Sequence, residues 1–381
     1  MKQAFVWCCS VVLVPALSVC AGDSSSPAPD AGAASAWTVS AVPVASLHRE
    51  AGPLCGAVLD SSGRILLCER RQGRIDVYNP DGTRVAQWDG SGDATGSFHS
   101  LHYLGPWAGD SVAALDQWGF AVTVFGPDGQ VGRRFELPVP RVLRHGIKLH
   151  GAFPDGSFLF SYYPIANPFA WVSWEGARTD SAEYHLVDKQ ASRFLGRFPP
   201  GGDHKVQMSE TEGVVETPPL ANRRLTAVGD SQWYVAWSDT YDVAVYSPNG
   251  EEIGRIRRPD PSERVDPALA DWLNRRFIDE AETEYFRDAR IRIVDMVNDG
   301  GRLPAIWELL AGPGNELWIG ELGQEEDGAL EWSVFDDHGR LIGRVTTPPG
   351  LALLCVGEQH ILAGTTDGSF VELYELRRGD G

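Results

Sequence analysis

Clusters of basic residues and the short motifs of common enzymes are both missing from this sequence. The 381 residues carry 33 lysines and arginines against 52 aspartates and glutamates, which gives a formal net charge of −19 at pH 7. Surfaces that follow nucleic-acid phosphates need clustered positive charge, so we expect no nucleic-acid partner. No nucleophile elbow, phosphate-binding loop or paired Cys and His is recognisable, and we therefore assign no catalytic residue.

Long apolar runs are also scarce, and one at the N-terminus has the features of an export signal. Residues 4–17 are apolar over a length typical of a signal peptide, but they are too short to cross a bilayer comfortably. Leu17-Ser18-Val19-Cys20 then resembles a bacterial lipobox, although Val19 stands where that motif prefers Gly, Ala or Ser. Ordinary cleavage after Val19-Cys20-Ala21 is the alternative.

Either processing route predicts an exported protein. We expect residues 1–20 to be a lipoprotein-like signal peptide and Cys20 to carry a lipid that tethers the protein to a membrane. Residues 21–36 are small and polar and cannot bury enough apolar surface to fold, so they are expected to form a flexible linker. By resemblance to lipoproteins, the lack of Asp directly after Cys20 favours the outer membrane, facing the periplasm. Without lipidation the protein would be periplasmic.

The cysteines do not form an obvious disulfide framework. Two of the six lie in the signal segment and Cys20 is the expected lipidation site, so Cys55, Cys68 and Cys355 remain. Cys55 and Cys68 flank a turn at residues 60–63. A two-residue loop would pair them across two strands and permit a bridge, whereas a type I turn ending in a left-handed glycine would put them on opposite faces. Asp-Ser-Ser-Gly suits the second turn better, and buried thiols are the alternative to a bridge.

A phrase of apolar residues followed by a turn built on Pro-Asp-Gly or a variant recurs along the chain. Its clearest copies are residues 77–83, 124–130, 245–251 and 334–340. Each is preceded by a second apolar run, and both features can be counted six times. A repeat of about 40–50 residues that ends in strand–turn–strand is typical of a β-propeller blade. We therefore predict an all-β, six-bladed β-propeller over residues 37–381.

The last repeat is short, because the chain ends soon after residues 374–376. Residues 37–42, near the start of the mature protein, are expected to supply its missing outer strand. A last blade shared by the N- and C-terminal strands would close the ring and leave no exposed sheet edge.

Residues 57–78 resemble the NHL form of the propeller repeat. Glu69 stands at the acidic position of that motif, and Gly73 stands near the place where asparagine is usual. The sequence is thus similar to six-bladed propellers of the NHL-repeat and TolB-like kind over nearly all of residues 37–381, and it resembles uncharacterised bacterial propeller lipoproteins. The resemblance is specific for the fold and implies little about function.

A helical insertion is predicted at about residues 266–300, between the fourth and fifth blades. Asp266 and Pro267 form a helix start, and apolar residues then recur at helical spacing. In propellers that this chain resembles, such a link lies on the face where the central channel opens. We expect either a lid over the channel mouth or a brace on the propeller edge, since both would bury the apolar stripe.

Links before the innermost strands and the ends of the next strands should surround the channel mouth, which is the expected ligand site. Candidates at these positions combine both charge signs with aromatic rings. They are Glu69, His102, His145, Tyr162, Arg223, Arg224, Asp239, Trp307 and Glu308.

Two kinds of metal site can be imagined from family resemblance. The amidating-lyase branch of NHL propellers holds zinc with histidines, which His102, His145 and a third histidine could supply. Lactonase-like propellers hold calcium with Glu, Asn and Asp, for which Glu69, Asn222, Asp239 and Glu308 are candidates. The characteristic residues around them are absent, so we assign no metal ligand and no cofactor, with Ca²⁺ or Zn²⁺ as the alternative.

We therefore predict an exported, membrane-tethered β-propeller that binds a protein or a small molecule without catalysis, and we expect it to be monomeric. The alternative is a metal-dependent hydrolase or lyase of the NHL or lactonase-like type. A binding role is favoured over an enzymatic one because the fold pattern is clear and every catalytic pattern is weak.

Overall fold

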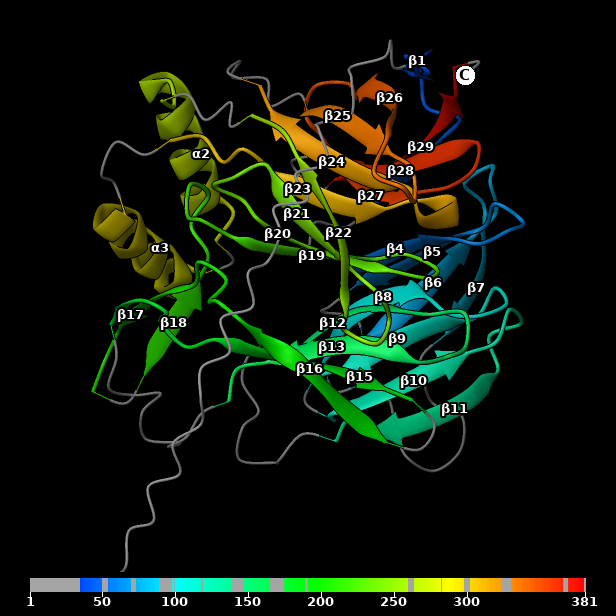
Figure 1. Ribbon diagram of the computed structural model, residues 1–381, viewed down its shortest axis with the longest axis horizontal. Helices are drawn as coiled ribbons and strands as arrows, with labels where there is room; N and C mark the ends of the chain where they lie inside the picture. The colour runs from blue at the N-terminus through cyan, green and yellow to red at the C-terminus, as the bar shows by residue number, and fades with distance from the viewer. Residues whose placement is uncertain are drawn as a thin grey trace, which may run out of the picture.

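The computed structural model describes residues 35–49, 54–69, 73–88, 98, 100–117, 119–138, 147–164, 175–188, 191–210, 212–259, 264–281, 283–297, 302–323, 330–365 and 369–379. Figure 1 shows antiparallel sheets on one side of the molecule and two helices on the other. The expected signal peptide and Cys20 lie outside the described residues. None of the helices in the described part has the length and apolarity that a membrane-spanning helix needs.

Six of the sheets contain an antiparallel meander of successive strands. The first three are β4 (Leu54–Leu59), β5 (Ile65–Glu69), β6 (Arg74–Tyr78) and β7 (Arg84–Trp88); β8 (Leu101–Pro106), β9 (Val112–Asp116), β10 (Ala121–Phe125) and β11 (Val131–Glu136); and β12 (Lys148–Ala152), β13 (Phe158–Tyr162), β15 (Ala182–Val187) and β16 (Ser192–Phe198).

The other three meanders follow the same order. They are β19 (Arg224–Val228), β20 (Trp233–Trp237), β21 (Asp242–Tyr246) and β22 (Glu252–Arg257); β23 (Glu308–Ala311), β24 (Leu317–Leu322), β25 (Leu330–Phe335) and β26 (Leu341–Thr346), with a 3₁₀ turn, η1 (Pro313–Asn315), after β23; and β27 (Leu351–Val356), β28 (His360–Thr365) and β29 (Phe370–Arg377).

The first strands of these six sheets form a closed cycle of contacts. β4 contacts β8, β8 contacts β12, and the series continues through β19, β23 and β27 back to β4. Apolar side chains fill the space between neighbouring sheets, as Val58, Leu66 and Val77 of one sheet do against Leu104 and Phe125 of the next. The predicted all-β class is confirmed, and the arrangement is that of a propeller.

N-terminal strands complete the last sheet. β2 (Thr38–Val39), part of the predicted segment 37–42, pairs with β29, and β3 (Ala45–His48), which the sequence did not suggest, pairs with it further along. β1 (Ser35–Ala36) lies within the range expected to be linker, yet it pairs in parallel with β26 of the neighbouring sheet. The N-terminal strands therefore cross the seam between two sheets.

The recurrent Pro-Asp-Gly turn has a second role besides reversing the chain. Its glycines adopt a left-handed φ of 76–85°, and each lies against an apolar side chain from the last strand of the preceding sheet. The pairs are Gly82 with Leu47, Gly129 with Trp88, Gly250 with Leu195, and Gly339 with Ile256. A methyl group on Gly129 would lie 2.2 Å from Nε1 of Trp88. Glycine is thus required both by the turn and by the packing of one sheet on the next.

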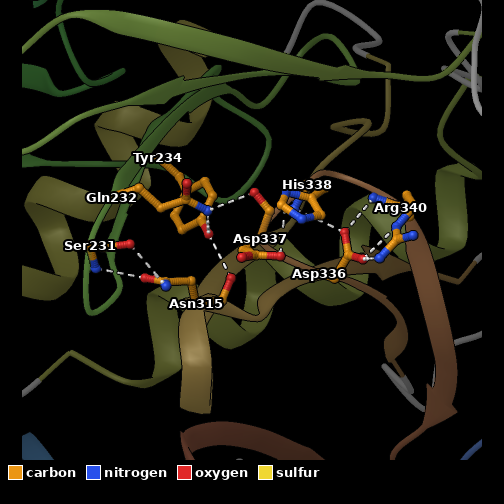
Figure 2. A network of polar contacts seen from close by, with 8 residues as sticks. All are labelled: Ser231, Gln232, Tyr234, Asn315, Asp336, Asp337, His338 and Arg340. Atoms are coloured by element: carbon orange, nitrogen blue, oxygen red, sulfur yellow. Dashed lines mark hydrogen bonds and ion pairs between the residues drawn. The ribbon is translucent and has the colours of Figure 1, made fainter.

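The turns after the first strands are also linked from sheet to sheet. Asn315, which has a left-handed φ of 65°, accepts a hydrogen bond at Oδ1 from the backbone N–H of Ser231 at 2.7 Å, and its carbonyl oxygen accepts one from the Tyr234 hydroxyl at 2.7 Å (Figure 2). Asp110, with φ of 57°, accepts in the same way from the N–H of Ser61 at 3.0 Å. These contacts hold the rarely adopted backbone of both residues.

Cys55 and Cys68 form a disulfide, with their Cα atoms 5.3 Å apart. The turn between them is the second of the two alternatives, because Asp60 pairs with Arg64 and Gly63 has φ of 79°. That turn alone would place the cysteines on opposite faces. A register shift between Leu54 and Gly56 makes Cys55 the extra residue of a β-bulge. Because a bulge changes the direction of a side chain, Cys55 can then reach Cys68. The preference against a bridge was wrong because the sequence gives no sign of the bulge.

The two helices fall within residues 266–300, and the second of them packs against a small sheet. This sheet contains β14 (Gly176–Ala177), β17 (His204–Gln207) and β18 (Gly213–Glu216). α2 (Pro267–Asp279) begins after Asp266, whose side chain accepts from the N–H of Ala268, and α3 (Glu284–Val297) buries Ala289 and Ile293 against the small sheet. We call α2, α3 and this sheet the cap; Figure 1 shows α2, α3, β17 and β18 together at the left.

Gly129→Ala tests whether the turn glycines are contact points between sheets. Strain at a left-handed φ costs an alanine about 1 kcal/mol, and the displacement of Trp88 should raise the loss of unfolding free energy to about 3 kcal/mol. Gly109→Ala is the matched control, because Gly109 has φ of 63° and no atom near the new methyl. Equal losses for the two variants in urea denaturation would show that the contact with Trp88 adds nothing.

Removal of the disulfide should lower stability. The bridge closes a loop with a sequence separation of 13, for which loop-closure entropy corresponds to about 3 kcal/mol. We expect the double variant Cys55→Ala, Cys68→Ala to have an unfolding free energy lower by that amount, and therefore to unfold at a lower urea concentration. Its urea midpoint should not change when dithiothreitol is added. A wild-type protein whose urea midpoint does not respond to dithiothreitol would contradict this expectation.

Candidate functional site

The innermost strands offer two distinct regions at their two ends. The turns that follow these strands line a central cavity of about 960 Å³. The sequence-predicted residues lie at the opposite end, where Arg224 and Glu308 are the first residues of β19 and β23. Lys148 is the first residue of β12 in the sheet before them. This end, next to the cap, is the candidate site.

Arg223 and Arg224 reach toward different neighbouring sheets, because consecutive residues of an extended chain point in opposite directions. The guanidinium of Arg223 lies 4.5 Å over the Trp307 ring and donates from Nη2 to the Trp307 carbonyl at 3.0 Å. Arg224 donates from Nε to the Tyr184 hydroxyl at 2.9 Å and from Nη1 to the Pro199 carbonyl. One dipeptide therefore connects three sheets at the site.

Among the residues that the structure describes, Arg224 is held by neutral groups and by no carboxylate. Besides Tyr184 and Pro199, it is 3.5 Å from the Phe198 carbonyl and 3.4 Å from the hydroxyl of Tyr163. Hydroxyls and carbonyls satisfy the N–H donors but leave the positive charge uncompensated. The charge is thus available to an anion.

Lys148 is exposed and shares this region with three arginines. The surrounding protein lowers its pKa by desolvation; Asp203 acts in the opposite direction, and Arg224, Arg178 and Arg223 lower the pKa further. The sequence contains four lysines in all, so a lysine here is unusual for this chain. We call Lys148, Arg178, Arg223 and Arg224 the basic cluster.

Arg178 joins the cluster from the segment just after β14. It forms an ion pair with Asp203 at 3.3 Å, and its guanidinium lies 4.1 Å over the Tyr163 ring. Asp203 also accepts from the Thr217 hydroxyl at 2.7 Å. Sequence reasoning did not identify Arg178 or Asp203, because both belong to a link whose short strands show no clear pattern.

Glu308 is the acidic member of the site. Burial raises its pKa to about 7, and the positive charge of Arg223 limits the increase. Its Oε2 atom is shielded from solvent and has no hydrogen-bond partner among the described residues, and the same is true of Nε of Arg223. One donor atom and one acceptor atom are thus buried without a hydrogen-bond partner among the described residues.

His150 lies two residues into β12 and is not a charged member of the cluster. Its ring stacks on Tyr184 at 5.0 Å, and Nε2 lies 2.8 Å from the Ser161 hydroxyl. Burial lowers its pKa well below the usual value, and the charges of Arg224 and Lys148 act in the same direction. The imidazole is therefore neutral at physiological pH.

The other sequence candidates have different partners. Glu69 forms an ion pair with Arg49 at 3.3 Å, and Tyr162 donates to Glu183 at 3.0 Å within an aromatic stack. Asp239 accepts from the Asn222 amide at 3.4 Å. His102 lies at a register shift in β8, and His145 is outside the described residues. Arg223, Arg224, Trp307 and Glu308 are thus the predicted residues that come together.

Metal binding has no geometric support in the described ranges. No group of three or more His, Cys, Asp or Glu side chains that could hold an ion occurs within them. The Ca²⁺ and Zn²⁺ alternatives stay hypotheses.

No protein-family model and no curated protein matches the sequence. Solved structures similar to this chain are propeller-type proteins. A member of the DUF4221 family from Bacteroides vulgatus is 8% identical with a TM-score of 0.51, over 91% of this chain and 99% of that one. Virginiamycin B lyase from Staphylococcus aureus is 11% identical with a TM-score of 0.43, over 90% and 99%. A calcium-binding protein, regucalcin, from Agrobacterium tumefaciens is 10% identical with a TM-score of 0.43, over 91% and 97%. At these identities the likeness concerns the fold alone.

Glu308→Gln should change how stability depends on pH. The pKa of Glu308 is 4.5 in the unfolded state and about 7 in the folded state. The folded state therefore holds this proton more tightly, which stabilises it to the full extent below pH 4.5. This contribution to the unfolding free energy is lost as the pH rises through about 7. Glutamine mimics the protonated form. We expect the variant to match wild type at pH 4 and to be more stable by about 1–3 kcal/mol at pH 8. A stability difference that does not vary between pH 4 and pH 8 would contradict the assignment.

Proposed function

We propose that the protein is a ligand-binding propeller whose site for a small organic anion is the basic cluster beside the cap. In this proposal the six meander sheets are the blades of a six-bladed, NHL-like propeller, and the cap is the helical insertion between the fourth and fifth blades together with the small sheet. The role is binding, without catalysis.

One observation carries the proposal: the guanidinium groups of Arg178 and Arg224 lie 4.1 and 5.7 Å from the same Tyr163 ring, and the solvent-accessible Lys148 is close enough for their charges to lower its pKa. Like charges in a partly desolvated place oppose folding, so such a cluster is costly unless it is used. The cluster stands out in a protein with a net charge of −19, whose surface otherwise repels anions. A bound carboxylate or phosphate would offset the repulsion through charge-assisted hydrogen bonds.

The cap contacts this site through Trp307. The apolar cluster of α2, with Leu269 and Leu273, includes Leu220 and Trp307. Trp307 thus lies between α2 and the Arg223 guanidinium, so α2 fixes the position of a residue at the site. This contact favours a role as lid over a role as edge brace.

The cellular setting of the proposal follows the N-terminal sequence. Export, lipidation of Cys20 and attachment to the outer membrane would present the site to the periplasm, where small organic acids diffuse. We expect a monomer. The alternative, a metal-dependent hydrolase or lyase, predicts zinc or calcium bound in stoichiometric amount after dialysis, which elemental analysis would detect.

Lys148→Met tests the proposed anion site. By isothermal titration at constant ionic strength, with propionate, cyclohexanecarboxylate and inorganic phosphate as probes, we expect wild type to bind at least one, and the variant to bind it about ten-fold or more weakly. The variant should be at least as stable as wild type, because the change removes a positive charge that three arginines repel.

Arg377→Met is the charge-matched control. Arg377 is exposed on β29 and pairs with Glu375 at 3.0 Å, outside the basic cluster. The Arg377→Met variant should bind the probes with the same affinity as wild type. Equal weakening in both variants, or no binding by wild type, would refute the anion site.

A further inference from the structure

The basic cluster and the central cavity lie along the same innermost strands. Lys148 and Arg224 are the first residues of β12 and β19. Two positions further along these strands, His150 and Thr226 line the cavity of about 960 Å³. Two residues of a strand advance about 7 Å, and alternate residues point to the same side of it. The lining of the cavity therefore begins about 7 Å along the strands from the two cations.

Side-chain contacts connect the two regions. The Tyr184 hydroxyl lies 2.7 Å from the Thr226 hydroxyl and accepts a hydrogen bond from Nε of Arg224 at 2.9 Å. One side chain thus links a cation of the cluster to a residue of the cavity lining. Burial lowers the pKa of His150, and the charges of Arg224 and Lys148 lower it further, so both cations act on a second residue of the lining.

Between the six innermost strands the lining of the cavity carries no charge. It is made there by residues 57–59, 103–106, 150–152, 226–228, 309–311 and 354–356. None of these residues is acidic, arginine or lysine, and His150 is neutral. Leu310 and Leu354 are partly exposed although they lie on innermost strands, so the cavity contains apolar surface that a ligand could cover.

The far end of the cavity has the opposite charge to the basic cluster. Asp230 and Glu358, which are exposed in the turns after β19 and β27, line the cavity at this end. A carboxylate would be repelled there and attracted at the starts of the strands. The order of surfaces is thus positive, uncharged and negative, which matches a molecule with an acid group at one end and an apolar chain behind it.

We propose that the ligand is an aliphatic carboxylic acid of medium chain length. Its carboxylate lies at Lys148, Arg178 and Arg224, and its chain extends along the innermost strands into the central cavity. This inference rests on the anion site proposed above. The cluster selects the acid group, and the uncharged lining selects the chain.

The strands set the length of chain that fits. An extended chain of single bonds advances about 1.2 Å per bond, as the peptide backbone does over its three bonds per residue. About six carbons are therefore needed to cover the first 7 Å. Ala152, the last residue of β12, is about 13 Å from Lys148 along the strand, which corresponds to about eleven bonds. Acids of about eight to twelve carbons should thus bind best.

The test is a chain-length series measured by isothermal titration at pH 8 with propionate, hexanoate, octanoate and decanoate. Each methylene removed from water contributes about four-fold to affinity, so decanoate should bind wild type at least a hundred-fold more tightly than hexanoate. Equal affinity for all four acids would overturn the chain site and leave the anion site intact. Failure of every acid to bind would overturn both.

Two further probes keep the length of octanoate and change its charge. Octanedioate would place a second carboxylate in the uncharged part of the cavity, so it should bind at least ten-fold more weakly than octanoate. Octylamine carries the same chain on a cation and should bind more weakly still. Octanedioate that binds as tightly as octanoate would refute the chain site, whereas octylamine that does so would refute the anion site.

Variants separate the two parts of the ligand. Ala152 is partly exposed and lines the cavity, so Ala152→Phe should weaken decanoate about ten-fold and leave propionate unchanged. Ala191→Phe is the matched control, because Ala191 is exposed before β16, the outermost strand of the same sheet. Lys148→Met should weaken propionate and decanoate by the same factor. Equal effects of the two phenylalanine variants on decanoate would contradict the proposed position of the chain.

The wild-type series decides the inference if Ala152→Phe does not fold.

Discussion

Packing of one sheet's last strand on the next sheet's turn glycine is the contact on which the architecture depends. In the pairs Gly82 with Leu47 and Gly129 with Trp88, the absence of a side chain lets an apolar residue of the preceding sheet lie against the turn. Because Leu47 belongs to the N-terminal strand β3, the same contact joins the last sheet to the first. The turn that reverses the chain is therefore also the contact between neighbouring sheets, and this explains why the sequence phrase recurs so regularly.

Repetition is what made the fold readable in the sequence, and its limits follow from the same cause. The turns and apolar runs predict the meanders, and Asp266 followed by Pro267 predicts the start of α2. Features that occur once leave no such signal. The bulge at Cys55 is one, and it decides the disulfide against the turn type. The small sheet is another, because β14 has two residues, and too few apolar positions to show a period.

The site was predictable where it lies on repeated elements and not elsewhere. Arg223, Arg224 and Glu308 stand at the starts of innermost strands, positions that the repeat locates. Arg178 and Asp203 come from the link that carries the small sheet, so nothing in the sequence brings them near Lys148. Tyr162 illustrates the converse: it is the last residue of β13, but its hydroxyl donates to Glu183 and its ring stacks on His185.

Charge distribution connects the fold to the proposed ligand. A chain of net charge −19 gains solubility from its acidic surface but repels small acids, so an anion site must overcome the field of the whole molecule at short range. Arg224 can attract an anion because its N–H groups donate to neutral oxygens, those of the Tyr184 hydroxyl and the Phe198 carbonyl. These oxygens hold the guanidinium in place but do not neutralise its positive charge. Lys148 and Arg224 are the first residues of β12 and β19, so the sheets hold their backbones in place. In the proposed function, the clustered positive charge of this lysine-poor, acidic protein is a binding feature retained against stability.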